Sequence, residues 1–180
     1  MTISAVLGGI GAVWIIAAIA TEGCSDFVKL ETDFNATRYT GLWYEHARDE
    51  NIKFEKGHCQ QARYRDDGEL ASDGRLTVIN SQHKDGSFDT VKGFAECEGG
   101  QCSVEFKWFV PKGDYRIVAT DYDNYSVVYS CSKILGIYKV EFAWILGRTQ
   151  QLQDSIRSNA YDLLKSRVPD YDTTRLKKTN

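Results

Sequence analysis

Eight short segments in the middle of the chain are rich in β-branched and aromatic residues, and apolar and polar positions alternate along them. Successive side chains of a β-strand point to opposite faces, so this pattern predicts strands that are apolar on one face. The predicted strands cover residues 41–50, 59–66, 74–82, 87–97, 102–110, 115–121, 125–131 and 138–147. Eight neighbours joined by short turns favour an antiparallel up-and-down β-barrel, because closing the sheet leaves no strand edge exposed.

Two of the segments show which residues face the interior of this barrel. The shared faces hold Val104, Phe106, Trp108 and Val110 in one segment, and Tyr138, Val140, Phe142, Trp144 and Leu146 in the other. Two strands with this much aromatic bulk supply more than a thin core needs, and an eight-stranded barrel has room for one small ligand. A barrel packed solid by these side chains is the alternative.

After Arg148 the apolar spacing changes to three and four residues, which predicts one amphipathic helix over about residues 150–167. Its apolar positions are Leu152, Ile156, Ala160, Leu163 and Leu164. Pro169 ends the pattern, and we expect the helix to pack on the barrel wall. Residues 168–180 form a C-terminal tail, and its short basic run, Arg175–Lys178, is expected to be a solvated end.

The first twenty residues carry no charge, and Ala18 and Ala20 stand at the small positions before a cleavage point. This pattern predicts a cleaved secretory signal over residues 1–20, with a retained membrane anchor as the alternative. Residues 21–180 then form a single domain, with the barrel over about 41–148. Secretion also permits disulfide bonds.

Composition and charge exclude several classes of function. The 180 residues include 22 Lys and Arg against 25 Asp and Glu, a net charge of −3, which argues against nucleic-acid binding. The three histidines lack metal-ligand spacing, and the chain has no nucleophile-elbow or phosphate-loop motif. We therefore expect no catalytic residue, no metal and no required cofactor.

Three short motifs occur in a specific order along the predicted barrel. Gly41-Leu42-Trp43 lies in the first strand, Thr120-Asp121-Tyr122 ends the sixth, and Arg148 follows the eighth. In this combination the chain resembles the lipocalin family. The resemblance implies that Trp43 plugs the closed end with the Arg148 guanidinium stacked on it, and that Gly41, Thr120, Asp121 and Tyr122 have structural roles.

Longer blocks, including Phe54–Cys59 and Phe142–Leu146, are similar to the apolipoprotein D-like and bilin-binding animal branches of that family. The resemblance implies a secreted carrier of a small hydrophobic ligand: a fatty acid, steroid, retinoid or tetrapyrrole. One alternative is a chromoprotein that holds a bilin. Another is a structural subunit with a solid barrel that binds no ligand and is tethered by an uncleaved leader.

The resemblance also implies which residues hold the ligand, a bound lipid or a biliverdin-type tetrapyrrole. By position in the family blocks these are Tyr64, Asn80 and Trp144, and strand alternation adds Phe106, Trp108, Val110 and Phe142. In the apolipoprotein D-like branch, the position of Val110 is a methionine linked to lipid hydroperoxide reduction. The only methionine here is Met1, so that chemistry is not expected.

The chain has five cysteines, so at least one is left unpaired within it. The resemblance implies a Cys24–Cys131 disulfide, and Cys97 and Cys102 can join the two strands that flank their hairpin. Cys59 then remains without a partner at the barrel mouth. A free thiol there would link a dimer or hold a ligand or small thiol covalently, and the alternatives are that the thiol is simply buried or that the chain stops before its partner cysteine. We expect a monomer or a dimer linked through Cys59.

Two further surface features follow from the sequence. Ile134, Leu135 and Ile137 form an apolar loop, which contacts a membrane or lipoprotein particle, covers the ligand, or packs as an ordinary loop. Asn35 and Asn124 each begin an N-glycosylation sequon.

Overall fold

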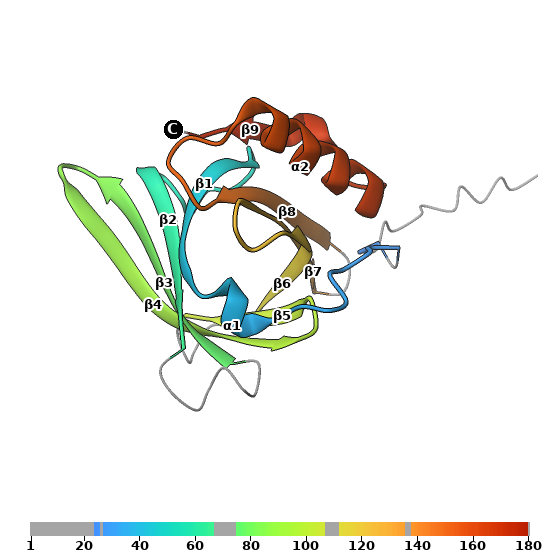
Figure 1. The fold of residues 1–180 in the computed structure, drawn as a ribbon, viewed down its shortest axis with the longest axis horizontal. Coiled ribbons are helices and arrows are strands. Elements are labelled where there is room, and N and C mark those ends of the chain that lie inside the picture. The colour runs from blue at the N-terminus through green and yellow to red at the C-terminus, as the bar shows by residue number, and fades with distance from the viewer. Residues whose placement is uncertain (1–23, 26, 67–74, 107–111, 136–137, 180) are drawn as a thin grey trace, which may run out of the picture.

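The structure is a computed structural model, and it describes residues 24–25, 27–66, 75–106, 112–135 and 138–179. Eight antiparallel strands follow one another around a barrel, and pairing of the second strand with the first closes it (Figure 1). They are β1 (Gly41–Asp49), β2 (His58–Arg65), β3 (Arg75–Lys84), β4 (Ser87–Glu98), β5 (Gln101–Glu105), β6 (Gly113–Thr120), β7 (Tyr125–Ile134) and β8 (Tyr138–Gly147). The predicted fold class is therefore confirmed. Seven strands begin and end within three residues of the prediction, whereas β5 stops at Glu105, five residues before the predicted end at residue 110.

The two ends of the barrel differ in how they are covered. At the end where β1 starts and β8 stops, the inner face is filled by large side chains such as Trp43 and Leu76, and we call this the closed end. We call the opposite end the mouth. The connections between β1 and β2, β3 and β4, and β7 and β8 lie there, as strand direction requires.

The helix α2 (Asp154–Arg167) packs on the outer side of β6, β7 and β8, and covers β8 in Figure 1. Its Ala160 and Leu164 are fully buried against outward-facing side chains such as Ala143 and Ile145. The helix begins four residues later than predicted, because residues 149–153 form a connection in which the Thr149 hydroxyl donates to the carbonyl of Gln151.

The expectation of a solvated tail is wrong. A short 3₁₀ helix, η2 (Thr173–Arg175), leads into a ninth strand, β9 (Leu176–Lys178), which pairs with residues 47–49 of β1. The physical reason is that β2 pairs only with residues 41–44 of β1. The tail therefore satisfies backbone groups of β1 that would otherwise form an open edge.

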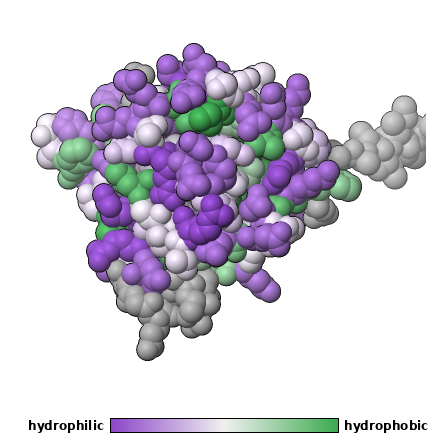
Figure 2. Space-filling model, viewed as in Figure 1, coloured by the Kyte–Doolittle hydropathy of each residue, from purple (hydrophilic) through white to green (hydrophobic). Residues whose placement is uncertain are grey.

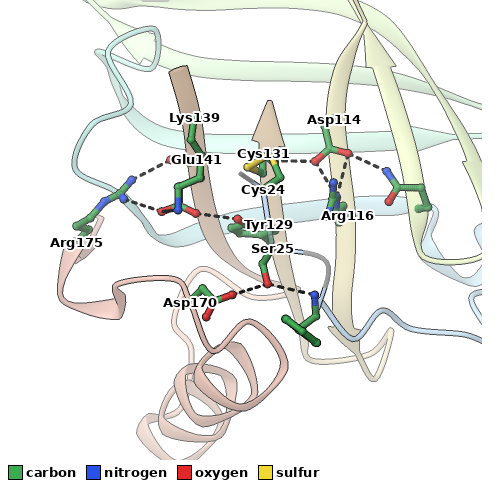
Figure 3. Close-up of a disulfide and its surroundings, with 12 residues drawn as sticks. Cys24, Ser25, Asp114, Arg116, Tyr129, Cys131, Lys139, Glu141, Asp170 and Arg175 are labelled. Carbon is green, nitrogen blue, oxygen red and sulfur yellow. Dashed lines mark hydrogen bonds and ion pairs between the residues drawn. A yellow bond between two sulfur atoms is a disulfide. The ribbon is translucent and has the colours of Figure 1, made fainter. Parts of the chain in front are cut away.

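Two disulfide bonds cross-link the fold. Cys24 is bonded to Cys131 on β7, and the bond lies beside polar residues of β6 and β8 (Figure 3). Cys97 is bonded to Cys102, its direct partner across the β4–β5 hairpin. Cys59 is a free, exposed thiol at the start of β2.

The surface in Figure 2 is mostly polar, and apolar residues are scattered over it. The predicted apolar loop is exposed where it is described, with Leu135 84% exposed, while Ile137 lies outside the described residues. Within the described ranges, no helix is long and apolar enough to span a membrane. The same part of the chain holds no group of three His, Cys, Asp or Glu side chains suited to a metal ion.

Candidate ligand-binding site inside the barrel

The inner face of the barrel is buried at the closed end and partly exposed toward the mouth. Trp43, Tyr64 and Val78 are buried, whereas Phe142 and Trp144, nearer the mouth, are partly exposed. Alternate residues of one strand share a face, so this gradient follows the barrel axis. Solvent therefore reaches the inner face from the mouth, and the floor is sealed.

The seal at the closed end is built around Trp43 and Arg148. The guanidinium carbon of Arg148 lies 3.7 Å from the centre of the Trp43 ring, and Arg148 Nε donates to the carbonyl of Tyr122 at 2.8 Å. Trp43 Nε1 donates to the carbonyl of Tyr39 at 2.9 Å. Gly41 has a φ of 102°, and a Cβ there would lie 2.9 Å from Arg148 Nη1, so the stack requires glycine at this position.

The turn between β6 and β7 is held by Thr120 and Asp121. The Thr120 hydroxyl donates to the carbonyl of Tyr125 and accepts from the amide of Tyr122. Asp121 Oδ1 accepts from three backbone amides of the turn. Partial burial alone would raise the pKa of Asp121, but these hydrogen bonds outweigh it and hold the pKa below its usual value.

The two sequons differ in whether the side-chain amide nitrogen of the asparagine is available for glycosylation. Asn35 is exposed and uses only its side-chain oxygen, as the N-cap of α1 (Ala36–Tyr39), whereas Asn124 Nδ2 donates to Asp121 Oδ2 at 2.8 Å. We therefore expect glycosylation at Asn35 when the chain is secreted by eukaryotic cells, and little at Asn124. Enzymatic deglycosylation and intact mass measurement should show no glycan on the Asn35→Gln variant and an unchanged glycan on Asn124→Gln. The opposite result would contradict this assignment.

Three tyrosine hydroxyls meet on the floor of the inner face. Tyr64 donates to the Tyr115 hydroxyl at 2.7 Å, and the Tyr39 hydroxyl lies 2.8 Å from that of Ser126. Burial raises the pKa of Tyr39 to about 12, and also raises the pKa of Tyr64 and Tyr115. Tyr64 was predicted as a ligand residue, but Tyr39 and Tyr115 were missed. Strand alternation along β6 is the signal that indicates Tyr115.

The wall above this floor is aromatic and includes one unsatisfied amide. Phe142 and Trp144 pack edge to face with ring centres 6.0 Å apart, and Phe54 of the mouth loop packs on Phe142 at 5.9 Å. Phe106, like Trp144, packs against the buried cluster that contains Trp43 and Tyr64. The Oδ1 atom of Asn80 is buried without a hydrogen-bond partner among the described residues. An enclosed acceptor of this kind is costly unless a donor reaches it.

A charged group also lies on the inner face, and a β-bulge puts it there. Residues three apart on a regular strand face opposite sides, yet Glu45 pairs with Leu146 and Arg48 pairs with Trp144. The extra residue between Glu45 and Ala47 turns both side chains inward. Arg48 Nη1 lies 3.1 Å from Glu45 Oε1.

The connection between β1 and β2 adds a second carboxylate, that of Glu55. Glu55 Oε2 accepts from Trp144 Nε1 at 3.3 Å and lies 3.8 Å from Arg48 Nη1. Glu45 is only 8% exposed, and its burial together with the nearby Glu55 raises its pKa to about 9, although Arg48 acts in the opposite direction. The protonated, neutral form of Glu45 is therefore favoured at neutral pH.

Comparison with known proteins places this barrel in a family. The Lipocalin-like domain model matches residues 34–180. The chain belongs to the lipocalin family. It is 34% identical over 156 residues to apolipoprotein D of Macaca fascicularis, covering 79% of this chain and 80% of that protein. It is 35% identical over 159 residues to the Lazarillo protein of Schistocerca americana, covering 83% and 72%. Insecticyanin from Manduca sexta has the same fold, with a TM-score of 0.74, 23% identity and coverage of 87% and 85%.

In this lipocalin the predicted ligand residues fall into three sets. Tyr64 lies on the floor, and Asn80, Phe106, Phe142 and Trp144 lie on the inner wall, while Trp108 and Val110 lie outside the described residues. The inward-facing charged group was not predicted. Glu45 and Arg48 lie on either side of a β-bulge in β1, and Glu55 lies in a loop. The alternation of apolar and polar residues does not predict the direction of a side chain in either place.

Proposed function

We propose that this lipocalin is a secreted carrier that binds one small hydrophobic ligand on the inner face of its barrel. The observation that carries the proposal is the gradient of side-chain exposure along the barrel axis. Aromatic side chains of the wall near the mouth are accessible, whereas the floor at the closed end is sealed. Such a wall supplies apolar contact area, and the unsatisfied oxygen of Asn80 offers an orienting hydrogen bond. Membership of the lipocalin family supports a carrier over an enzyme.

Titration with a fatty acid, a steroid, retinol and biliverdin tests this proposal. We expect saturable quenching of tryptophan fluorescence by at least one of them, because Trp144 lies on the proposed wall. Phe142→Ala should weaken that binding by about tenfold, since it removes apolar contact area. Phe94→Ala is the matched control, because Phe94 is 40% exposed and its chain neighbour Ala95 faces inward.

The titration also separates the alternatives. Preferential binding of biliverdin with visible colour would identify a chromoprotein. No saturable quenching by any of the four compounds would contradict the carrier function and favour a solid barrel.

A further inference from the structure

Glu45, Arg48 and Glu55 form a charged group on the inner wall near the mouth. This group contains two carboxyl groups and one cation. The single guanidinium already faces both carboxyl groups, at 3.1 Å and 3.8 Å. With both glutamates ionised, the group would carry a net negative charge in a partly desolvated place. In the free protein a proton on Glu45 removes that charge.

A ligand that enters from the mouth meets this group. The side chains of Arg48 and Glu55 are 20% and 22% exposed, and Glu55 is bonded to Trp144 of the proposed ligand wall. The charged groups that act on Glu45 are Arg48 and Glu55, while β8 contributes the neutral Trp144, and Thr179 of the C-terminal segment offers a hydroxyl. The proton is therefore the compensating cation that a ligand can replace.

We propose that Glu45, Arg48 and Glu55 select ligands whose polar end is an organic cation, an amphipathic amine whose ammonium group binds between the two carboxyl groups. The proposal rests on the proposed function, because it assigns a ligand class to the same inner face. The exchange is balanced: the ammonium group binds between the carboxylates, and the proton of Glu45 leaves to solvent. No covalent bond changes.

The chemistry of the surrounding groups disfavours an anionic ligand. A carboxylate would add a third acidic group beside one guanidinium that is already engaged. An ammonium group has three hydrogen-bond donors and no acceptor. It suits carboxylate oxygens, and an additional donor on the ligand could serve Asn80 Oδ1, which is unpaired among the described residues of the same inner face.

Three amphiphiles with the same alkyl chain test the proposal: dodecylamine, dodecanol and dodecanoate. We expect dodecylamine to bind about tenfold more tightly than dodecanoate at neutral pH. Its affinity should rise by about tenfold per pH unit between about pH 6 and pH 8, because the amine stays protonated while Glu45 must lose its proton. Calorimetry in buffers of different ionisation enthalpy should show release of about one proton per ligand.

Variants identify the groups responsible. Glu45→Gln should abolish the proton release and the preference for the amine. Glu55→Gln provides a second, independent variant, because a glutamine oxygen can still accept from Trp144. Glu50→Gln is the matched control: it lies on the same mouth loop, but its carboxylate faces Lys177 at 3.6 Å, and its binding profile should match that of the original chain.

The outcomes distinguish this inference from the proposed function. Binding of dodecanol with no preference for the amine over dodecanoate would overturn the cation selectivity and leave the carrier function standing. An amine preference that persists in both Glu45→Gln and Glu55→Gln would overturn the assignment to this group. If none of the three compounds, nor any of the four hydrophobic compounds above, binds, then the carrier function itself fails.

The proton on Glu45 also has a measurable effect in the free protein. Burial raises the pKa of Glu45 above its value in the unfolded chain, so the folded state binds more protons between the two pKa values. The free energy of unfolding should therefore fall as pH rises from about 6 to about 9, by up to about 1.4 kcal/mol per pH unit. Urea denaturation at several pH values should show this slope, and a slope unchanged in Glu45→Gln would contradict a proton on Glu45.

Discussion

Replacing both Cys24 and Cys131 with alanine is expected to lower the free energy of unfolding by about 4.7 kcal/mol. The bond joins residues 107 apart in the chain, so the unfolded state gains much conformational freedom when it is removed. The bond also begins the segment that leads to α1, in which the amide of Lys29 donates to the carbonyl of Arg167 at 2.9 Å. Loss of the anchor should loosen this segment.

The matched control is the double alanine variant at Cys97 and Cys102. These residues are only five apart, so the same entropy model gives about 2 kcal/mol for their bond. All variants should carry Cys59→Ser, because the exposed thiol of Cys59 could otherwise exchange with either bond. Urea denaturation of the three proteins measures the difference. Equal losses for the two bonds would contradict the long-loop explanation.

The barrel and its order of strands could be predicted because their signals are local. In residues 138–147 every second residue from Tyr138 to Leu146 is large and apolar, which gives one continuous apolar face, and β8 has these bounds. The start of the helix could be predicted less accurately than the strands. The apolar spacing already begins at Leu152, but residues up to 153 form a connection in which the Thr149 hydroxyl donates to the carbonyl of Gln151. Periodicity reports which face is buried, and it does not report where the backbone turns helical.

The parts that the sequence did not reveal depend on contacts between distant segments. The strand β9 exists because residues 47–49 of β1 are left without β2 as a partner, which no local pattern indicates. The inward pair of Glu45 and Arg48 depends on a single bulged residue that reverses the alternation. Glu55 joins this pair from a loop, where strand periodicity has no meaning.

Replacing Arg175 with methionine is expected to lower the free energy of unfolding by about 3 kcal/mol. Arg175 Nη2 lies 2.5 Å from Asp49 Oδ2, and Arg175 Nη1 lies 3.1 Å from Glu141 Oε1. Asp49 is 0% exposed, so removing the guanidinium leaves a buried carboxylate with much less compensation. Methionine keeps the aliphatic bulk of the side chain, so the loss measures mainly the charge.

Lys177→Met is the control from the same segment, because Lys177 forms an exposed pair with Glu50 at 3.6 Å. Exposed pairs contribute little, so this change should cost less than about 1 kcal/mol. Hydrogen exchange adds a local measurement: the amide of Glu50 donates to the carbonyl of Arg175, and its protection should fall in Arg175→Met. If the two variants lost equal stability and Glu50 stayed protected, the tail would not be held by the buried ion pairs. The opposite result would establish that the C-terminal segment, expected from its composition to be solvated, is an integral part of the barrel wall.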